Sequence, residues 1–129
     1  MKPPTRTLRI AIADDEVDIR DYFTALLPRL GHRLVGAACN GRELVQLCLA
    51  EETDLVITDI MMPEMDGLAA AEQIARHQTE LDSMVPVIVM SSHDRPQTKD
   101  KPWIVDYLVK PVTIDDLKGA IDNACHLKD

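Results

Sequence analysis

The chain has 129 residues, 46% hydrophobic and 28% charged, a balance typical of a single globular domain spanning residues 1–129 and not of a disordered chain. Its 14 Lys and Arg residues against 22 Asp and Glu give a net charge of -8, which disfavours direct binding to nucleic acid or to an anionic membrane surface. No apolar run approaches the ~18 residues that a membrane-spanning helix needs.

Short β-branched or aliphatic runs predict five strands after a flexible polar leader at residues 1–7. The runs lie at residues 8–13, 33–38, 55–58, 85–90 and 107–109. Residues 87–90 form a continuous apolar block, which is typical of a strand buried on both faces of a parallel sheet.

Amphipathic stretches between these runs predict helices. The second helix should begin at Asn40, with Glu43 at capping-box spacing, the third near Asp66, and the last at Thr113. The first helix should end at Gly31, and its buried face should carry Ile19, Tyr22, Phe23, Leu26, Leu27 and Leu30.

The segment at residues 93–102 differs from the other connections because it contains Pro96 and Pro102 and has no apolar residue at helical spacing. The two prolines and the missing apolar periodicity predict a loop or one or two turns at this segment in place of a full fourth helix. The alternation of strands and helical connections nevertheless predicts an α/β fold, with a parallel sheet covered by helices on both faces.

Polar residues follow the predicted strands at the points where they end: Asp14 and Asp15, Asp59, Ser91 and Lys110. Because the carboxyl ends of parallel strands meet at one edge of a sheet, these side chains should converge. Three carboxylates there would repel one another by a few kcal/mol per pair without a cation. Oxygen ligands alone favour Mg²⁺, and a metal beside a lysine and a hydroxyl indicates phosphoryl transfer.

Each of these residues also has an ordinary structural interpretation. Asp14, Asp15 and Glu16 could cap the first helix, Asp59 could be a turn residue, Ser91 could bond to backbone, and Lys110 could be a solvated surface lysine. Five independent accidents at one sheet edge are much less probable than one site, so the sequence favours a site.

The residues that carry this pattern resemble the receiver domain of two-component response regulators, the CheY-like family. The resemblance runs in order through residues 12–16, residues 59–67, Ser91 and residues 107–111. It implies a flavodoxin-like, doubly wound, five-stranded parallel sheet in the order 2-1-3-4-5, here with a shortened or irregular fourth helix.

The resemblance implies a phosphorylation-activated switch. Asp59 would accept a phosphoryl group from the phosphohistidine of a histidine kinase, with Lys110 pairing with the phosphoryl oxygens. Asp15, Asp59 and the backbone carbonyl of Met61 would ligate Mg²⁺, and Asp14 would orient a metal-bound water. Such a domain catalyses its own phosphorylation and dephosphorylation without being a classical enzyme.

The resemblance also identifies Ser91 and Tyr107 as the switch pair, whose hydroxyl and ring move on phosphorylation, and Gly67 and Pro111 as structural residues. A cis bond before Pro111 would aim the preceding lysine into the crevice, although a trans proline before the last helix is the alternative. Met61 and His93 flank the phosphoryl position, so we expect them to modulate dephosphorylation.

The output end departs from the family pattern. Trp103 follows the irregular segment and could be an exposed anchor for a partner or a cover for the core. The expected partners are a sensor histidine kinase or phosphotransfer protein, and either a downstream effector protein or an output domain that this chain lacks. A homodimer remains compatible with the resemblance. Three cysteines without CxxC spacing favour a reducing compartment, the cytoplasm, over a disulfide framework or a zinc site.

Two other classes of function compete with the switch. A degenerate receiver could act as a constitutive docking module, but none of the five site positions is lost. A hydrolase with an aspartyl-phosphate intermediate lacks its DxD motif after the first strand, and an FMN-binding flavodoxin-like protein lacks a Ser/Thr-rich phosphate loop there. The sequence also has no Walker loop or GxGxxG motif for nucleotide binding.

Overall fold

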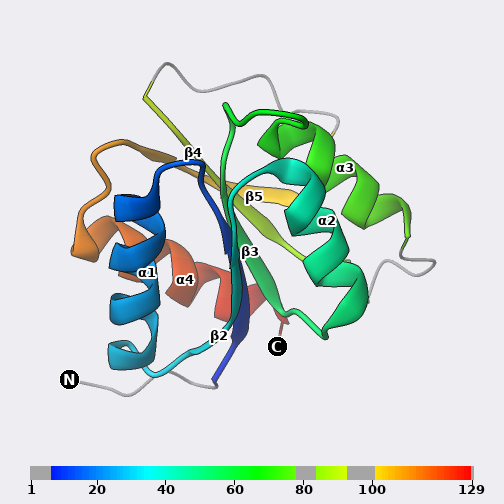
Figure 1. Ribbon diagram of the computed structural model, residues 1–129. Helices are drawn as coiled ribbons and strands as arrows, with labels where there is room; N and C mark the ends of the chain where they lie inside the picture. The colour runs from blue at the N-terminus through cyan, green and yellow to red at the C-terminus, as the bar shows by residue number, and fades with distance from the viewer. Residues whose placement is uncertain (1–6, 78–83, 93–100, 129) are drawn as a thin grey trace.

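The computed structural model describes residues 7–77, 84–92 and 101–128 of the chain. Within these ranges, five parallel strands form one sheet in the spatial order β2-β1-β3-β4-β5, which confirms the predicted order (Figure 1). The strands are β1 (Arg9–Ala13), β2 (Arg33–Ala38), β3 (Leu55–Asp59), β4 (Val87–Ser91) and β5 (Ile104–Val109).

Four helices connect or follow these strands in the described part of the chain, and three begin at the predicted caps. They are α1 (Val17–Arg29), α2 (Gly41–Ala50), α3 (Gly67–Arg76) and α4 (Ile114–Lys128). The side chain of Asn40 accepts a hydrogen bond from the Glu43 amide at 2.8 Å. The side chains of Asp66 and Thr113 likewise accept from the amides three residues later, so a local hydrogen bond sets each helix start.

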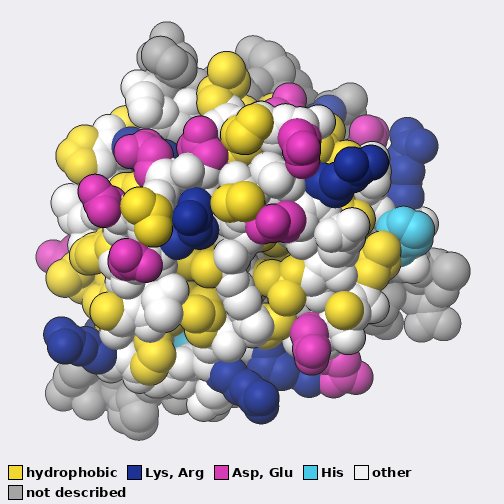
Figure 2. Space-filling view, viewed as in Figure 1, with side chains coloured by type: hydrophobic (Ala, Val, Ile, Leu, Met, Phe, Trp, Pro, Cys, Tyr) yellow, Lys and Arg dark blue, Asp and Glu magenta, His cyan; other side chains and the backbone are white. Residues whose placement is uncertain are grey.

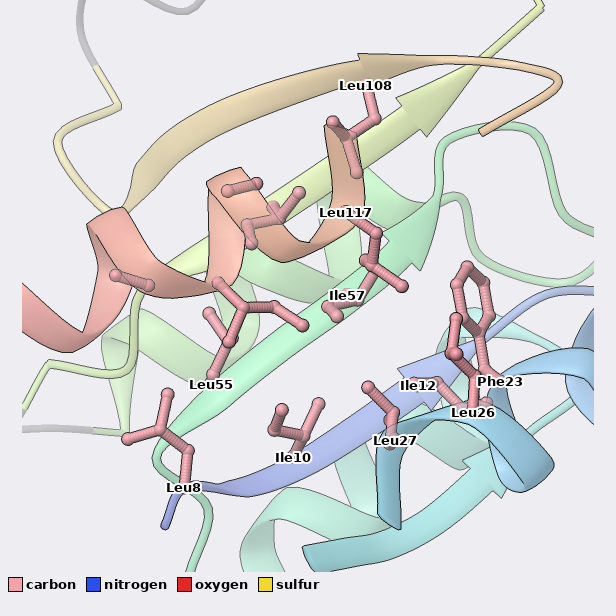
Figure 3. Packing of buried hydrophobic residues seen from close by; sticks show 14 of the residues in the cluster. Leu8, Ile10, Ile12, Phe23, Leu26, Leu27, Leu55, Ile57, Leu108 and Leu117 are labelled. Atoms are coloured by element: carbon pink, nitrogen blue, oxygen red, sulfur yellow. The ribbon is translucent and has the colours of Figure 1, made fainter. Parts of the chain in front are cut away.

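The helices cover the two faces of the sheet in pairs, with α1 and α4 on one face and α2 and α3 on the other (Figure 1). The core cluster under α1 and α4 contains Phe23, Leu27, Leu117 and Ile121 together with Ile10, Ile12, Leu55 and Ile57 (Figure 3). Burial of these side chains holds the carboxyl ends of β1 and β3 side by side.

Strand β4 is buried on both faces, as its unbroken apolar sequence predicts. Ile88 and Met90 enter the cluster under α1 and α4, whereas Val87 and Val89 enter the cluster under α2 and α3. Alternate side chains of one strand therefore join both layers of the core to the sheet.

The two last strands begin elsewhere than predicted. Strand β4 begins two residues later, after Pro86, which has no amide hydrogen to donate. Strand β5 begins three residues earlier, because Ile104 already pairs with Val87 of β4. In the sequence, the polar Asp106 interrupts the apolar run, so the pattern indicates a strand that begins only at Tyr107. Its carboxylate accepts a hydrogen bond from the adjacent Tyr107 amide at 2.8 Å.

Trp103 is half-buried and packs against the cluster under α2 and α3. Its indole nitrogen is buried and has no hydrogen-bond partner among the described residues. This placement supports the interpretation that Trp103 covers the core. The predicted irregularity at residues 93–102 lies outside the described residues except for Lys101 and Pro102, and residues 1–6 of the predicted leader lie outside them too.

The surface carries charges of both signs. On the face shown in Figure 2, the Lys and Arg side chains of the described residues lie in separate groups, with acidic and apolar side chains between them. None of the described helices is both long enough and apolar enough to span a membrane.

Candidate functional site

The carboxyl ends of β1 and β3 bring three carboxylates together at one edge of the sheet. One carboxylate oxygen from each of Asp14, Asp15 and Asp59 lies within 4.8 Å of the others. Asp14 and Asp15 follow β1 directly, and Asp59 is the last residue of β3, which is paired with β1 in parallel. The predicted convergence of these acids therefore holds in the structure.

The ammonium group of Lys110 lies among these acids. Its Nζ is 2.9 Å from Asp14 Oδ2, 3.2 Å from Asp59 Oδ2 and 3.8 Å from Glu16 Oε1. The Lys110 amide donates to the Ser91 carbonyl at 2.9 Å, which ties the end of β5 to the end of β4. The peptide bond between Lys110 and Pro111 is cis, as the resemblance implied.

Asp14 is the most enclosed of the acids, with a relative exposure of 1%. Its Oδ1 accepts a hydrogen bond from the Glu16 amide at 2.9 Å, so the carboxylate shapes the loop before α1 while its other oxygen faces Lys110. The backbone carbonyl of Asp14 accepts from Arg20 Nη1 at 2.8 Å. The role of Arg20 was not predicted from sequence, because its contact with the Asp14 carbonyl does not follow from a local pattern.

The electrostatics of the site favour a bound cation. Burial, followed by repulsion from Asp14, raises the pKa of Asp59, and Lys110 only partly offsets these effects. Burial alone would lower the pKa of Lys110, but its hydrogen bonds and attraction to Asp14 and Asp59 outweigh burial and raise it. Three carboxylates and one ammonium leave a net charge of about -2, which a divalent ion would neutralise.

The loop from β3 to α3 is folded tightly against Asp59. The Gly67 amide donates to the Ile60 carbonyl at 2.8 Å, and the Met65 amide donates to the Pro63 carbonyl at 2.7 Å. A Cβ on Gly67 would lie 2.1 Å from the Asp59 carbonyl oxygen, so only glycine allows α3 to begin there. This contact explains the structural role predicted for Gly67.

The remaining predicted residues lie around this centre or outside the described chain. Ser91 is buried at the end of β4, and Tyr107 is half-buried in β5 opposite Val89. Met61 follows Asp59 by two residues and its side chain is 69% exposed. His93 lies outside the described residues.

The comparisons with known proteins agree with this arrangement. The profile of the response regulator receiver domain matches residues 10–122, which include every acid of the site and Lys110. The chain belongs to the response regulator receiver family. The family assignment places this receiver in two-component signalling, in which receivers work with kinases or phosphotransfer proteins and with output domains.

Several relatives support the assignment. PdtaR, a transcriptional regulatory protein of Mycobacterium tuberculosis, is 37% identical over 119 residues, which cover 90% of this receiver but 56% of PdtaR. This chain thus spans about half the length of that relative. PilH of Pseudomonas aeruginosa is 35% identical over 119 residues, covering 88% of this chain and 94% of PilH.

Solved receiver structures have the same fold. A receiver domain protein from Clostridium thermocellum superposes with a TM-score of 0.80 at 28% identity, covering 94% of this chain and 96% of that one. TrrA of Thermotoga maritima, solved in complex with Mg²⁺ and BeF, has a TM-score of 0.76 at 27% identity, covering 92% of this chain and 99% of that one.

Proposed function

We propose that this receiver is a phosphorylation-activated switch and that Asp59 is its phosphoacceptor. The single observation that carries the proposal is the position of Asp59, a buried carboxylate held between Asp14, Asp15 and the Lys110 ammonium. A carboxylate is a poor nucleophile toward an anionic phosphoryl group until nearby positive charge neutralises the approaching oxygens. Lys110 provides part of this charge.

The residues of the site also suit Mg²⁺. Their donor set contains only oxygen atoms and carries excess negative charge, which hard divalent ions prefer. Asp15, Asp59 and the Met61 carbonyl would hold the ion, and Asp14 would orient one of its waters. When bound, Mg²⁺ supplies the positive charge that offsets the phosphoryl oxygens. The complex of the similar TrrA with Mg²⁺ and BeF supports this choice of metal.

In the proposed reaction, an Asp59 carboxylate oxygen attacks the phosphorus of a phosphohistidine on a sensor histidine kinase or phosphotransfer protein. The bond between phosphorus and the imidazole nitrogen breaks, and the nitrogen keeps the electron pair. The products are an acyl phosphate on Asp59 and an unmodified histidine on the partner. Lys110 Nζ, already 3.2 Å from Asp59 Oδ2, pairs with the transferred oxygens.

Phosphorylation would then alter the surface that partners bind. We propose that the Ser91 hydroxyl moves to bond the phosphoryl group and that the Tyr107 ring follows it inward, which changes the surface beside β5. This change would act on a downstream effector protein or on an output domain. The domain is a self-phosphorylating and self-dephosphorylating switch and not a classical enzyme. The three free cysteines suit the reducing cytoplasm as its compartment.

The proposal is tested by measuring the intact mass of the protein after exposure to acetyl phosphate. With Mg²⁺, the wild-type chain should gain one phosphoryl group, whereas chelation of the metal with EDTA should prevent the gain. The Asp59→Asn variant should remain unmodified with Mg²⁺, because its amide cannot form an acyl phosphate. A wild-type chain that takes up no phosphoryl group in the presence of Mg²⁺ would favour the constitutive docking module instead.

The lifetime of the acyl phosphate should depend on Met61 and His93. Replacing both by Ala should change the rate of dephosphorylation several-fold, because side chains beside the phosphoryl group control the approach of the attacking water. The rate is measured from the decay of phosphorylated protein after removal of the donor. Leu49→Ala, at an exposed position of α2, provides the control and should leave the lifetime unchanged. An unchanged lifetime in the double variant would exclude this role.

A further inference from the structure

We infer that the β2–α2 turn, residues 38–41, is a positioning element that holds together the loop that carries Asp14 and Asp15 and the loop that directly follows Asp59. The inference rests on the proposed Mg²⁺ site and extends it to a segment that contributes no charged side chain of its own. The two loops are the β1–α1 loop, residues 14–16, and the β3–α3 loop, residues 60–66. Figure 1 shows both loops and the turn at the same end of the sheet.

Two backbone hydrogen bonds join the turn to its neighbours. The Asp14 amide donates to the Ala38 carbonyl at 3.1 Å, and the Gly41 amide donates to the Met65 carbonyl at 3.0 Å. The turn therefore bonds on one side to the loop of Asp14 and on the other to the loop that follows Asp59. Its position sets how far apart these two loops lie.

Gly41 makes the second bond geometrically possible. A Cβ at this position would lie 2.2 Å from the Met65 carbonyl oxygen and 2.8 Å from the Met65 carbonyl carbon. Both are backbone atoms, so they can yield only if the whole β3–α3 loop moves. The nearest atoms to a Cβ on Gly36, in β2, belong instead to the end of the flexible Leu47 side chain, at 2.9 Å. Crowding at Gly41 is therefore transmitted to the site, whereas crowding at Gly36 is absorbed by a side chain.

The turn itself is held in one conformation. The Asn40 side chain accepts from the Glu43 amide, and Glu43 Oε1 accepts from the Cys39 amide at 3.0 Å. Hydrogen bonds from the backbone and side chain of Cys39 to the Glu43 carboxylate, with a smaller contribution from Arg20, lower the pKa of Glu43. Arg20 also donates to the Asp14 carbonyl, so the turn and the β1–α1 loop share a charged neighbour.

This arrangement matters because metal binding depends strongly on ligand positions. A site functions well only when its ligands are held to within about 0.5 Å, and losing an outer supporting contact typically weakens metal binding by roughly 10- to 100-fold. Displacement of the β3–α3 loop would move the Met61 carbonyl relative to Asp14 and Asp15. Gly41 thus acts as a positioning residue through the backbone of Met65.

The experiment compares Mg²⁺ affinity in three glycine variants by titration calorimetry with Mg²⁺ alone. We expect Gly41→Ala to raise the Kd for Mg²⁺ roughly tenfold. Gly36→Ala, which crowds the same helix through a flexible side chain, and Gly119→Ala, whose Cβ meets nothing within 4 Å, should stay within about twofold of wild type. Urea unfolding in EDTA measures stability separately, so a purely structural effect of Gly41→Ala would change unfolding and leave the Kd unchanged.

A second measurement uses the wild-type protein and does not depend on the folding of any variant. Amide hydrogen exchange at Gly41 and Asp14 should slow when Mg²⁺ is added. The ion would fix the β3–α3 loop, to which the Gly41 amide bonds, and the β1–α1 loop, which contains Asp14. The Glu51 amide, which bonds to Leu47 at the far end of α2, should exchange at the same rate with and without Mg²⁺.

The outcomes separate the two proposals. Wild-type protein that binds no Mg²⁺ would overturn the proposed function and with it this inference. Wild-type protein that binds Mg²⁺, together with a Gly41→Ala variant of unchanged Kd, would overturn the positioning role alone. If Gly41→Ala does not fold, exchange decides: unchanged exchange at Gly41 and Asp14 on Mg²⁺ binding overturns the role, and slowed exchange at both supports it.

Discussion

Replacing Gly67 by Ala should lower the free energy of unfolding by about 3 kcal/mol and impair the acid site at the same time. The new Cβ would lie 2.1 Å from the Asp59 carbonyl oxygen and 3.1 Å from Thr58 Oγ1. Thr58 Oγ1 donates to that same carbonyl at 2.9 Å, so the Thr58 hydroxyl already occupies the space beside the carbonyl oxygen. The start of α3 must therefore move away from β3, and Asp59 must move with its carbonyl.

Urea unfolding monitored by circular dichroism measures the loss of stability, and the intact-mass assay measures phosphoryl uptake on the same samples. Gly119→Ala is the matched control, because this exposed residue of α4 has open space around it. Alanine there should stabilise the helix by about 0.5–1 kcal/mol. If Gly67→Ala unfolds at the same urea concentration as wild type, the close approach of α3 to the Asp59 carbonyl does not require glycine at this position.

Replacing Lys110 by Ala should lower the stability of the metal-free protein by about 2 kcal/mol at neutral pH and abolish phosphoryl uptake. Asp14, with 1% exposure, and Asp59, with 6%, would lose the ammonium that compensates their burial. Removal of one partner from a buried ion pair costs more than the pair contributes, since the remaining charge stays desolvated. Mg²⁺ should restore part of the lost stability.

The effect of Lys110→Ala should depend on pH. Burial first, and repulsion from Asp14 second, hold the pKa of Asp59 above its unfolded value. The ionised form of Asp59 therefore destabilises the fold. Protonation removes this cost as the pH falls through the folded pKa. The pKa of Lys110 is raised in the folded protein. The stability that its ammonium contributes is therefore complete below its unfolded pKa, which includes neutral pH. This contribution is lost only as the pH rises through its folded pKa. The stability deficit of the variant is therefore largest near neutral pH and shrinks on acidification.

Urea unfolding in EDTA across the pH range measures this deficit. Arg76→Ala serves as the control, since Arg76 forms an exposed ion pair with Glu72 at 3.6 Å and should change stability by less than about 0.5 kcal/mol at any pH. A deficit in Lys110→Ala that grows toward acidic pH would show that the ammonium does not compensate the two buried carboxylates.

Local patterns in the sequence were sufficient for three of the helix starts and for most strands. Asn40, Asp66 and Thr113 each cap a helix through a hydrogen bond to an amide three residues later, which is a short-range interaction that the sequence displays directly. The extension of β5 to Ile104 was missed, because it depends on pairing with Val87 and not on the polarity of Asp106.

The amino-acid sequence by itself determined the α/β alternation and the placement of acids, hydroxyl and lysine at strand ends, because periodicity and strand boundaries are local properties. Only the tertiary structure decided which distant backbones touch. The contact of Gly41 with Met65, that of Gly67 with Asp59 and the bond from Arg20 to Asp14 arise when packing closes the loops onto one another. Residue type alone does not specify such approaches, since the missing side chain of a glycine becomes informative only when its neighbour in space is known.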